Sequence, residues 1–286
     1  MNLTVSFLTS ISLLVFSASS SAQVTPPQQG LLVDLNADHG VVVAENNKVE
    51  AWKNDAPTPK LETFEKQDKG RKIAGSGRPE LKKKLKEING HNSIAFVKQE
   101  LYNKDEDATD SLITGSGFTW VVILKPYHQT GDLKEVNTFF GNLKNSGNYE
   151  GVWGNLADDN RVWTGGRNGI TFGRWDPNNP FIATTQKLDS NRFYLLAGRM
   201  ESGTDTALTE IFINDFSVKA ATGYFPVNPK ANSSKLAVGE ERDATNHPGV
   251  EAFRGEMARF LLYKRPLTNK ELQTLGTQLI REYEIR

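Results

Sequence analysis

The stretch from Phe118 to Leu124 reads FTWVVIL, and all but one of its residues are apolar. In an extended chain, alternate side chains point to opposite faces. One face would then carry Phe118, Trp120, Val122 and Leu124, while the other face carries two further aliphatic residues. A strand that is apolar on both faces must be covered on both sides. We therefore predict a central strand of a β-sandwich.

Similar short runs, rich in β-branched and aromatic residues, recur along the chain between Gly, Asn and Asp residues. The further predicted strands are Leu31–Leu35, Val41–Ala44, Ser93–Val97, Phe193–Gly198, Thr209–Ile213, Lys235–Val238 and Ala258–Tyr263. Within IFINDFSV, Asn214 and Asp215 separate two apolar runs, which predicts a tight hairpin there.

One helix is predicted, at the end of the chain. Thr268 and Glu271 have the spacing of a capping box. An apolar stripe follows, formed by Leu272, Leu275, Leu279, Ile280 and Tyr283. Many strands with a single terminal helix predict an all-β fold, an antiparallel β-sandwich of jelly-roll type with a short C-terminal helix.

The end of the chain, from Leu236, carries a distinctive series of short motifs and reads LAVGEERDATNHPGVEAFRGEMARFLLYKRPLTNKELQTL. Its motifs are Gly239, Phe253-x-Gly255-x-x-Ala258, Tyr263 and Arg265-Pro266-Leu267, with Val49-x-x-Trp52-x-x-Asp55, Arg78-Pro79 and Ile88-Asn89-Gly90 earlier. Over roughly residues 31–283 the chain resembles the concanavalin A-like lectin/glucanase superfamily, particularly bacterial laminin-G-like jelly rolls. The resemblance implies one such domain over residues 31–286. It leaves the function open, because the superfamily includes lectins, binding modules, glycoside hydrolases and polysaccharide lyases.

The start of the chain predicts export. Residues 1–22 contain the apolar stretch FLTSISLLVF followed by small residues, which is typical of a signal peptide cleaved after Ala22. The stretch is too short to span a bilayer, for which about 20 apolar residues are needed. We predict residues 23–30 to be a short N-terminal linker, and the mature protein to be secreted or periplasmic.

Composition excludes some classes of partner. The 34 basic and 34 acidic residues balance, so no overall field favours nucleic acid, and no second apolar run predicts a membrane span. There is no cysteine, so the predicted exported domain must be held by its core alone.

The stretch from Gly147 to Phe181 holds three of the five tryptophans among many Gly, Asn and Asp residues. Indole faces stack on sugar rings, and amide or guanidinium groups bind hydroxyl and acidic groups. We predict a carbohydrate-binding surface made of Trp153, Trp163, Trp175, Arg161, Arg167, Asn168 and Arg174. If Arg161 and Trp163 lie in one strand they share a face, with Val162 opposite.

Two other functions remain open. A polysaccharide lyase needs a base and a group that neutralises a uronate carboxylate, for which the candidates are His128, Tyr149, Arg161 and Arg167. No strand alternates Glu, Asp and Glu onto one face, so a retaining hydrolase of this superfamily is disfavoured. A structural or protein-adhesion module is the third candidate.

No metal centre or cofactor is predicted, because the four histidines are far apart and none has metalloprotease spacing. A structural calcium ion at Asp105, Asp107 and Asp110 remains open. Between Lys60 and Lys98 there are eleven Lys or Arg and five Asp or Glu residues. Such a stretch is either a solvated surface or an attractor of anionic polysaccharide. The leading hypothesis is an exported, lectin-like protein for a polysaccharide, which could be anionic; the sequence specifies neither the glycan nor the oligomeric state.

Overall fold

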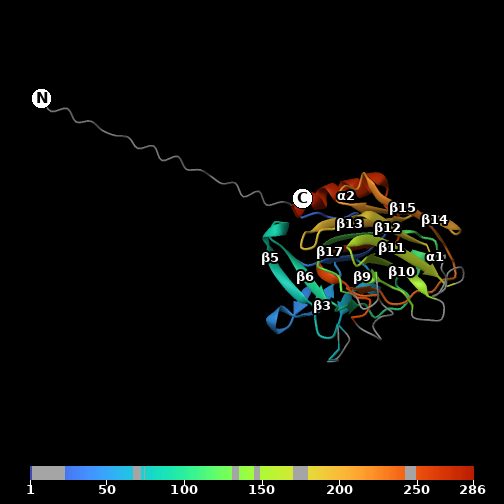
Figure 1. Ribbon diagram of the computed structural model, residues 1–286, viewed down its shortest axis with the longest axis horizontal. Coiled ribbons are helices and arrows are strands. Elements are labelled where there is room, and N and C mark those ends of the chain that lie inside the picture. The colour runs from blue at the N-terminus through green and yellow to red at the C-terminus, as the bar shows by residue number, and fades with distance from the viewer. Residues whose placement is uncertain are drawn as a thin grey trace.

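The computed structural model describes residue 1 and residues 23–66, 72–73, 75–130, 135–144, 149–169, 180–241 and 249–286. These residues form two antiparallel sheets packed face to face, with one long helix on the outside (Figure 1). The predicted all-β sandwich with a C-terminal helix is confirmed.

The first sheet, sheet A, has eight strands. Its order is β15 (Lys219–Pro226), β14 (Thr206–Ile213), β13 (Tyr194–Met200), β8 (Phe118–Pro126), β17 (Arg254–Tyr263), β6 (His91–Val97) and β5 (Glu80–Leu85), and β1 (Leu31–Asn36) also pairs with β17.

The second sheet, sheet B, has nine strands. Its order is β12 (Phe181–Lys187), β11 (Arg161–Asn168), β10 (Glu150–Leu156), β9 (Asn137–Gly141), β16 (Ala237–Val238), β7 (Leu101–Tyr102), β4 (Thr63–Glu65), β3 (Val49–Lys53) and β2 (Val41–Val43). The helices are α1 (Ser111–Thr114), α2 (Asn269–Glu282) and the short 3-10 turns η1 (Glu45–Asn47), η2 (Pro59–Leu61) and η3 (Lys86–Ile88).

Strand β8 is the predicted central strand, between β13 and β17, and all nine of its residues are buried. Trp120 and Val122 point into the core between the sheets, whereas Val121 and Ile123 belong to a second cluster on the outer face of sheet A. This alternation explains why its sequence is apolar on both faces.

Helix α2 covers that outer face (Figure 1). The predicted capping box is present: the Thr268 side chain accepts from the Glu271 N–H, and the Glu271 carboxylate accepts from the Thr268 N–H. The predicted stripe is buried against the sheet, with Ile280 at its half-buried edge.

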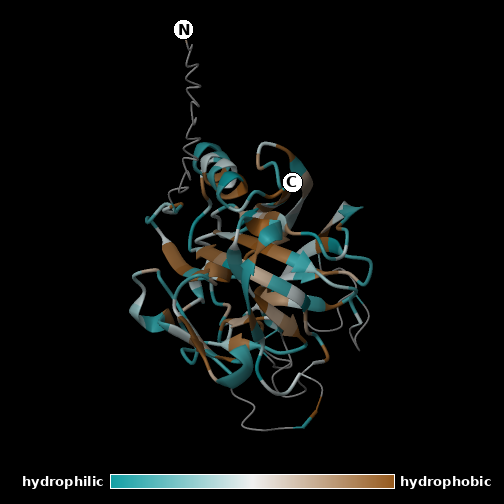
Figure 2. Ribbon diagram, turned by 90° about the vertical axis from the view of Figure 1, so that its left-hand side faces the viewer, coloured by the Kyte–Doolittle hydropathy of each residue, from teal (hydrophilic) through white to brown (hydrophobic). Residues whose placement is uncertain are grey.

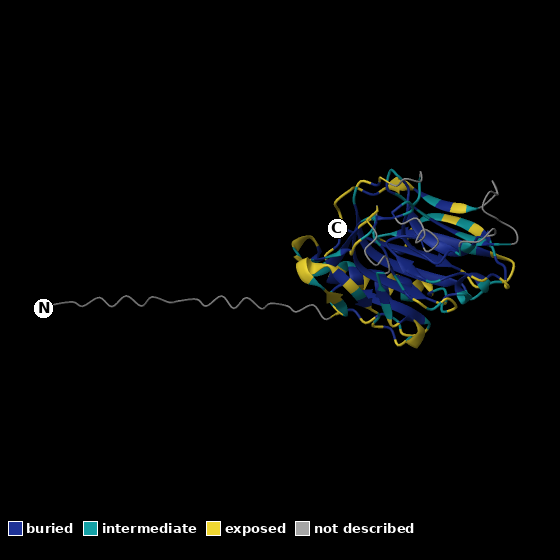
Figure 3. Ribbon diagram, turned by 90° about the horizontal axis from the view of Figure 1, so that it is seen from below, coloured by how far each residue is buried: buried dark blue, intermediate teal, exposed yellow. Residues whose placement is uncertain are grey.

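Figure 2 shows that apolar residues are concentrated along the strands, and Figure 3 shows that exposed residues lie mainly in turns and edge strands. Trp52 and Trp120 are fully buried, and the rings of Phe139 and Phe140 both pack against Trp120. A large apolar core therefore holds this cysteine-free domain together.

The hairpin predicted at Asn214 and Asp215 is present, but its turn is longer than the two residues expected. Strands β14 and β15 do form a hairpin, but residues 214–218 connect them. Phe216 lies in this connection and packs beneath α2, with its ring against the backbone of Gly276. Phe216 is thus buried in the connection, and the second strand begins only at Lys219.

Residues 23–30, expected to be a linker, are attached to the domain through Val24. Its N–H donates to Glu282 Oε2 at 3.1 Å, and its carbonyl accepts from Arg259. Arg259 is buried and also pairs with Asp34 at 2.8 Å. The start of the described chain is thus tied to β17 and α2.

Among the described residues, no helix is long and apolar enough to cross a bilayer.

Candidate functional site

Strands β10 and β11 place aromatic residues on the outer face of sheet B. Val152 and Val162 point into the core between the sheets. Their neighbours Trp153 and Trp163 belong to a separate cluster that also contains Leu143 and Tyr149. The expected alternation of Arg161 and Trp163 against Val162 is therefore present in β11.

Gly165 determines how Trp153 lies on this face. In the sheet register, Gly165 sits between Trp153 of β10 and Phe181 of β12. A Cβ atom at Gly165 would lie 2.2 Å from Cζ2 of Trp153. The indole therefore lies across the glycine backbone, where it is only 6% exposed and forms a floor.

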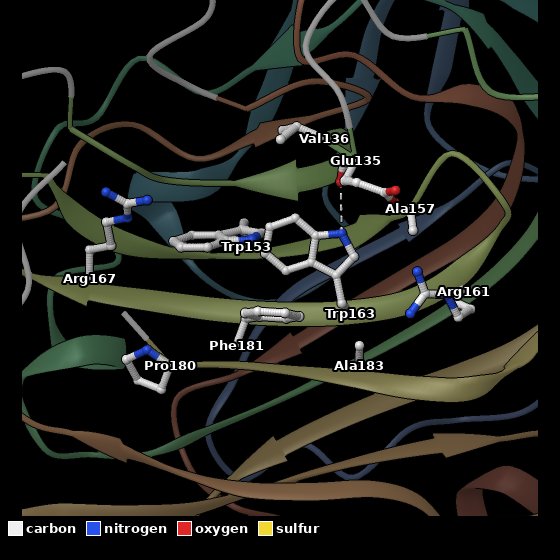
Figure 4. A pocket seen from close by; sticks show the side chains of 10 residues that line it. All are labelled: Glu135, Val136, Trp153, Ala157, Arg161, Trp163, Arg167, Pro180, Phe181 and Ala183. Carbon is white, nitrogen blue, oxygen red and sulfur yellow. Dashed lines mark hydrogen bonds between the residues drawn. The ribbon is translucent and has the colours of Figure 1, made fainter. Parts of the chain in front are cut away.

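Trp163 stands on this floor. Its ring meets Trp153 edge-to-face at 5.7 Å and 85°, and meets Phe181 at 5.8 Å and 74°. Its Nε1–H donates to the carbonyl oxygen of Glu135 at 2.9 Å. In Figure 4 the broad face of Trp163 is turned to the viewer, with Trp153 and Phe181 edge-on. The hydrogen bond and the two ring contacts fix the orientation of this indole.

These rings border a cavity of about 360 Å³. Small side chains leave this space open, since Ala183 lies opposite Trp163 in the register and Ala157 is part of the wall. The lining residues are Glu135, Val136, Trp153, Ala157, Arg161, Trp163, Arg167, Pro180, Phe181 and Ala183 (Figure 4).

At one end of the cavity Arg161 is held by Asp159. Its Nε donates to both carboxylate oxygens of Asp159 at 3.0 Å, and Lys187 Nζ contacts the same carboxylate at 3.0 Å. Partial burial would raise the pKa of Asp159, but the hydrogen bonds from Lys187 and Arg161 outweigh it and lower that pKa. The carboxylate therefore stays ionised, and Arg161 keeps its position, well into the acidic range.

Glu135 lies beside this end. Its backbone is in the left-handed region, with φ of 65°, and its carbonyl accepts from both Trp163 and Asn155. Its Oε2 atom accepts from the N–H of Asp158 at 3.2 Å. Figure 4 shows the Glu135 carboxylate and the Arg161 guanidinium on the same side of Trp163.

At the other end the guanidinium of Arg167 lies over the ring of Tyr149, 5.6 Å from its centroid. Tyr149 is 5% exposed and does not line the cavity. A cation over an aromatic face is attracted by the ring's quadrupole, so this contact supports Arg167 at the cavity wall.

The structure thus brings together Trp153, Trp163, Arg161 and Arg167 of the predicted binding set. Asn168 is buried and turned away: its carbonyl accepts from Asn228 at 2.7 Å, and its amide contacts the carbonyl of Pro226. Its parity in β11 is opposite to that of Arg167, which explains the difference. Arg174 and Trp175 lie outside the described residues.

The four lyase candidates are not gathered. His128 is exposed just beyond the end of β8, in sheet A, and is not part of the cavity wall. Its neighbour Tyr127 donates to Glu256 at 2.7 Å. Burial and this hydrogen bond raise the pKa of Tyr127, which makes it a poor base. Tyr149 lies beneath Arg167, so only Arg161 and Arg167 face the cavity.

In the part of the chain that the structure describes, no three His, Asp or Glu side chains are grouped to hold a metal ion. The acids considered for calcium have local partners instead. Asp105 accepts from the Asp107 N–H at 3.0 Å, and Asp110 accepts from the Ser233 hydroxyl at 3.1 Å.

The basic stretch lies away from the cavity. Its lysine-rich part forms β5, an edge strand of sheet A, at the opposite end of the molecule from β10–β12 (Figure 1). Lys82 pairs with Glu80, while Lys83, Lys84 and Lys86 are exposed. Lysines on an edge strand hinder pairing with another chain, and this role explains the lysines of β5. Residues 69–71 lie outside the described residues.

Two important wall residues were missed from the sequence. Phe181 is the last residue of the aromatic-rich stretch, and its aromatic side chain could have been included in the predicted binding surface. Glu135 has no such signal, because its place depends on the left-handed turn before β9 and on contacts with residues 155–163.

The arrangement around Gly165 can be tested by adding one methyl group. We expect Gly165→Ala to lower the free energy of unfolding by about 1–3 kcal/mol, because overpacking forces the Trp153 ring to move. The near-ultraviolet circular dichroism of the tryptophans should change with it. The control is Gly166→Ala, where the nearest atom to the new Cβ is 3.6 Å away. Equal unfolding curves for the two variants would show that Trp153 does not lie as described.

Known proteins agree with this architecture. Residues 103–273 match the model of the laminin-G-like family described as the concanavalin A-like lectin/glucanases superfamily. Among curated proteins, no sequence matches the chain.

Solved structures with the same fold include the Trypanosoma rangeli sialidase in complex with sialic acid. The TM-score is 0.55 at 13% identity, covering 93% of this chain but only 36% of the sialidase. Domain 4 of AbnA, an extracellular arabinanase from Geobacillus stearothermophilus, in complex with arabinotriose, aligns at a TM-score of 0.44 and 18% identity, covering 87% of this chain and all of that domain. At 13% identity the likeness to the sialidase concerns the fold alone. The family match covers more than half of the chain, and the protein therefore belongs to the concanavalin A-like lectin/glucanase superfamily.

Proposed function

We propose that the protein binds a saccharide in the cavity on the outer face of sheet B, with Trp163 as the stacking surface. The observation that carries this proposal is the fixed orientation of Trp163 in an open cavity. A preorganised ring needs no ordering when a ligand arrives, so more of the stacking energy contributes to affinity.

Polar groups beside the ring support the same function. Arg161 and Glu135 offer hydrogen-bond donors and acceptors next to an apolar face, the combination that a sugar ring with its hydroxyls requires. The cavity volume of about 360 Å³ is near the lower end of the usual range for ligand pockets, about 300–1,000 Å³. A short segment of a glycan fits this size better than a long groove-bound chain.

The alternatives receive less support. A lyase would need a base at the cavity, and neither His128 nor Tyr149 lines it. An adhesion module would be expected to show a continuous apolar patch. In the described part of the domain, the large exposed apolar side chains are instead spread over several segments: Val42, Val43, Ile73, Val97, Phe181, Val218 and Tyr224.

The test is incubation of the purified protein with a panel of algal, plant and animal polysaccharides. We expect at least one polymer to deplete the protein from solution without new reducing or unsaturated ends. New ends would make the protein an enzyme, and no depletion by any polymer would contradict saccharide binding.

We also propose that the protein is exported and cleaved after Ala22. The described fold supports this boundary, because Val24 is already bound to Glu282 and Arg259. N-terminal sequencing of the protein recovered outside the cytoplasm should begin at Gln23. Recovered protein that still begins at Met1 would contradict the proposal.

A further inference from the structure

We propose that the saccharide taken by this cavity is neutral and that two adjacent hydroxyl groups bind to Glu135 and Arg161. This inference rests on the proposed saccharide binding and names the class of sugar. It starts from the atoms of these two side chains that their own contacts leave available.

Arg161 uses only its Nε atom to hold Asp159. Among the described residues, no hydrogen bond engages its two terminal nitrogens, and Figure 4 shows them turned toward Trp163. Glu135 uses Oε2 to accept from Asp158, and within the same described part no partner engages Oε1. The cavity thus offers N–H donors and a carboxylate acceptor beside one indole face.

Neighbouring sugar hydroxyls match this pair. Each hydroxyl can donate one hydrogen bond and accept two. One hydroxyl can therefore donate to the Glu135 carboxylate while its neighbour accepts from the Arg161 guanidinium. Hydrogen bonds with one ionised partner are stronger than those between neutral groups.

The charges at this end do not favour an anionic sugar. Three carboxylates, those of Glu135, Asp158 and Asp159, lie around two cations, Arg161 and Lys187. Among the described residues, Arg167 at the far end brings the formal charge around the cavity to zero. A uronate or sulfate group beside Trp163 would lie near the Glu135 carboxylate, and like charges repel. The exposed lysines Lys83 and Lys84 lie on β5 in sheet A, away from the cavity on sheet B (Figure 1).

The test compares matched ligands. Oligosaccharides prepared from a polymer that retains the protein are used in neutral form and after oxidation of C6 to the uronate. Calorimetric titration should give about tenfold tighter binding of the neutral form, as expected for one charge-assisted contact. The affinity for the neutral form should change less than about twofold between low and high salt, because salt screens only interactions between charges.

Two variants link the preference to the two side chains. Glu135→Gln keeps an oxygen for the Asp158 N–H, and we expect it to weaken neutral binding about fivefold and to strengthen uronate binding. Arg161→Lys keeps the charge and loses the planar pair of donors, so neutral binding should again fall about fivefold. Lys83→Gln is the control: Lys83 is exposed on β5 and is not part of the cavity wall, and affinity should stay within about twofold.

Tighter binding of the uronate, a steep fall of affinity with salt, or unchanged affinities in Glu135→Gln would each overturn the inference. If the uronate is preferred and Trp163→Ala abolishes its binding, the site is right and the sugar class is wrong. If the wild-type protein binds neither form, the proposed function itself fails. Thermal unfolding of each variant shows whether a lost affinity reflects a lost fold.

Discussion

Replacing Trp163 with alanine is expected to weaken saccharide binding at least about thirtyfold, which equals roughly 2 kcal/mol. The substitution removes the stacking face, and it also removes the ring that separates Trp153 from Phe181. The fold should survive, because Trp163 is half-buried and outside the core between the sheets. Isothermal titration calorimetry with the retained saccharide measures the loss, and chemical denaturation measures the remaining stability.

Tyr224→Ala is the matched control. Tyr224 is a comparably large aromatic residue, 64% exposed, but it lies on β15 in sheet A. Its removal should leave the affinity within about twofold, as is usual for surface residues without a ligand contact. If Trp163→Ala retains wild-type affinity, or if Tyr224→Ala loses as much as Trp163→Ala, the sugar binds elsewhere.

The second large effect concerns stability and its dependence on pH. Two buried carboxyl groups, those of Glu100 and Glu240, interact with each other and with the charge of Lys66. Lys66 Nζ lies 2.5 Å from Glu100 Oε2 and 2.9 Å from the carbonyl of Gly75. Glu240 accepts from the Gly249 N–H at 2.8 Å. Two buried carboxyl groups that interact this closely disfavour each other's ionised form, which favours a proton on one of them.

That proton belongs on Glu240. Burial first, and the charge of Glu100 second, raise the pKa of Glu240 to about 10. At neutral pH the folded protein therefore holds a proton on this pair that an unfolded glutamate, with a pKa of about 4.3, has released. Between these two pKa values, stability falls as the pH rises, because the folded state binds more protons than the unfolded state.

Glu240→Gln should remove this fall of stability with rising pH. Glutamine keeps an oxygen for the Gly249 N–H and supplies N–H groups toward Glu100, without a titrating proton. We expect the difference in unfolding free energy between the variant and the wild type to grow by roughly 1 kcal/mol per pH unit between pH 5 and pH 8. The upper limit for one proton is about 1.4 kcal/mol per pH unit. Urea denaturation at several pH values measures the difference.

Glu62→Gln is the control for this series, because Glu62 is exposed to water. Its unfolding free energy should follow the wild type at every pH. If the difference in unfolding free energy between Glu240→Gln and the wild type stays constant between pH 5 and pH 8, Glu240 holds no proton in the folded state and the account is wrong.

The parts of the fold that could be predicted from the sequence are those with regular periodicity. FTWVVIL became β8 with both faces buried, and the capping box and leucine stripe became α2. In these segments the side chains that determine packing are also those that form the pattern.

The strands of the candidate site could not be predicted in this way. In β10 and β11, glycine replaces the apolar side chains that mark a strand. Gly154 makes room for the rings of Phe139 and Phe140 on the core side, and Gly165 makes room for Trp153 on the outer side. From the sequence alone these glycines indicate turns, because the rings that occupy the space beside them come from neighbouring strands. The clustering of tryptophans was visible in the sequence, whereas the role of Glu135 depends on tertiary contacts alone.

The most direct measurement is a crystal structure of the domain with the retained oligosaccharide bound. A sugar ring should lie flat against the face of Trp163, with adjacent hydroxyls on Glu135 and Arg161. Density for the sugar on the lysines of β5, or on any other surface while the cavity holds only solvent, would contradict saccharide recognition by the outer face of sheet B.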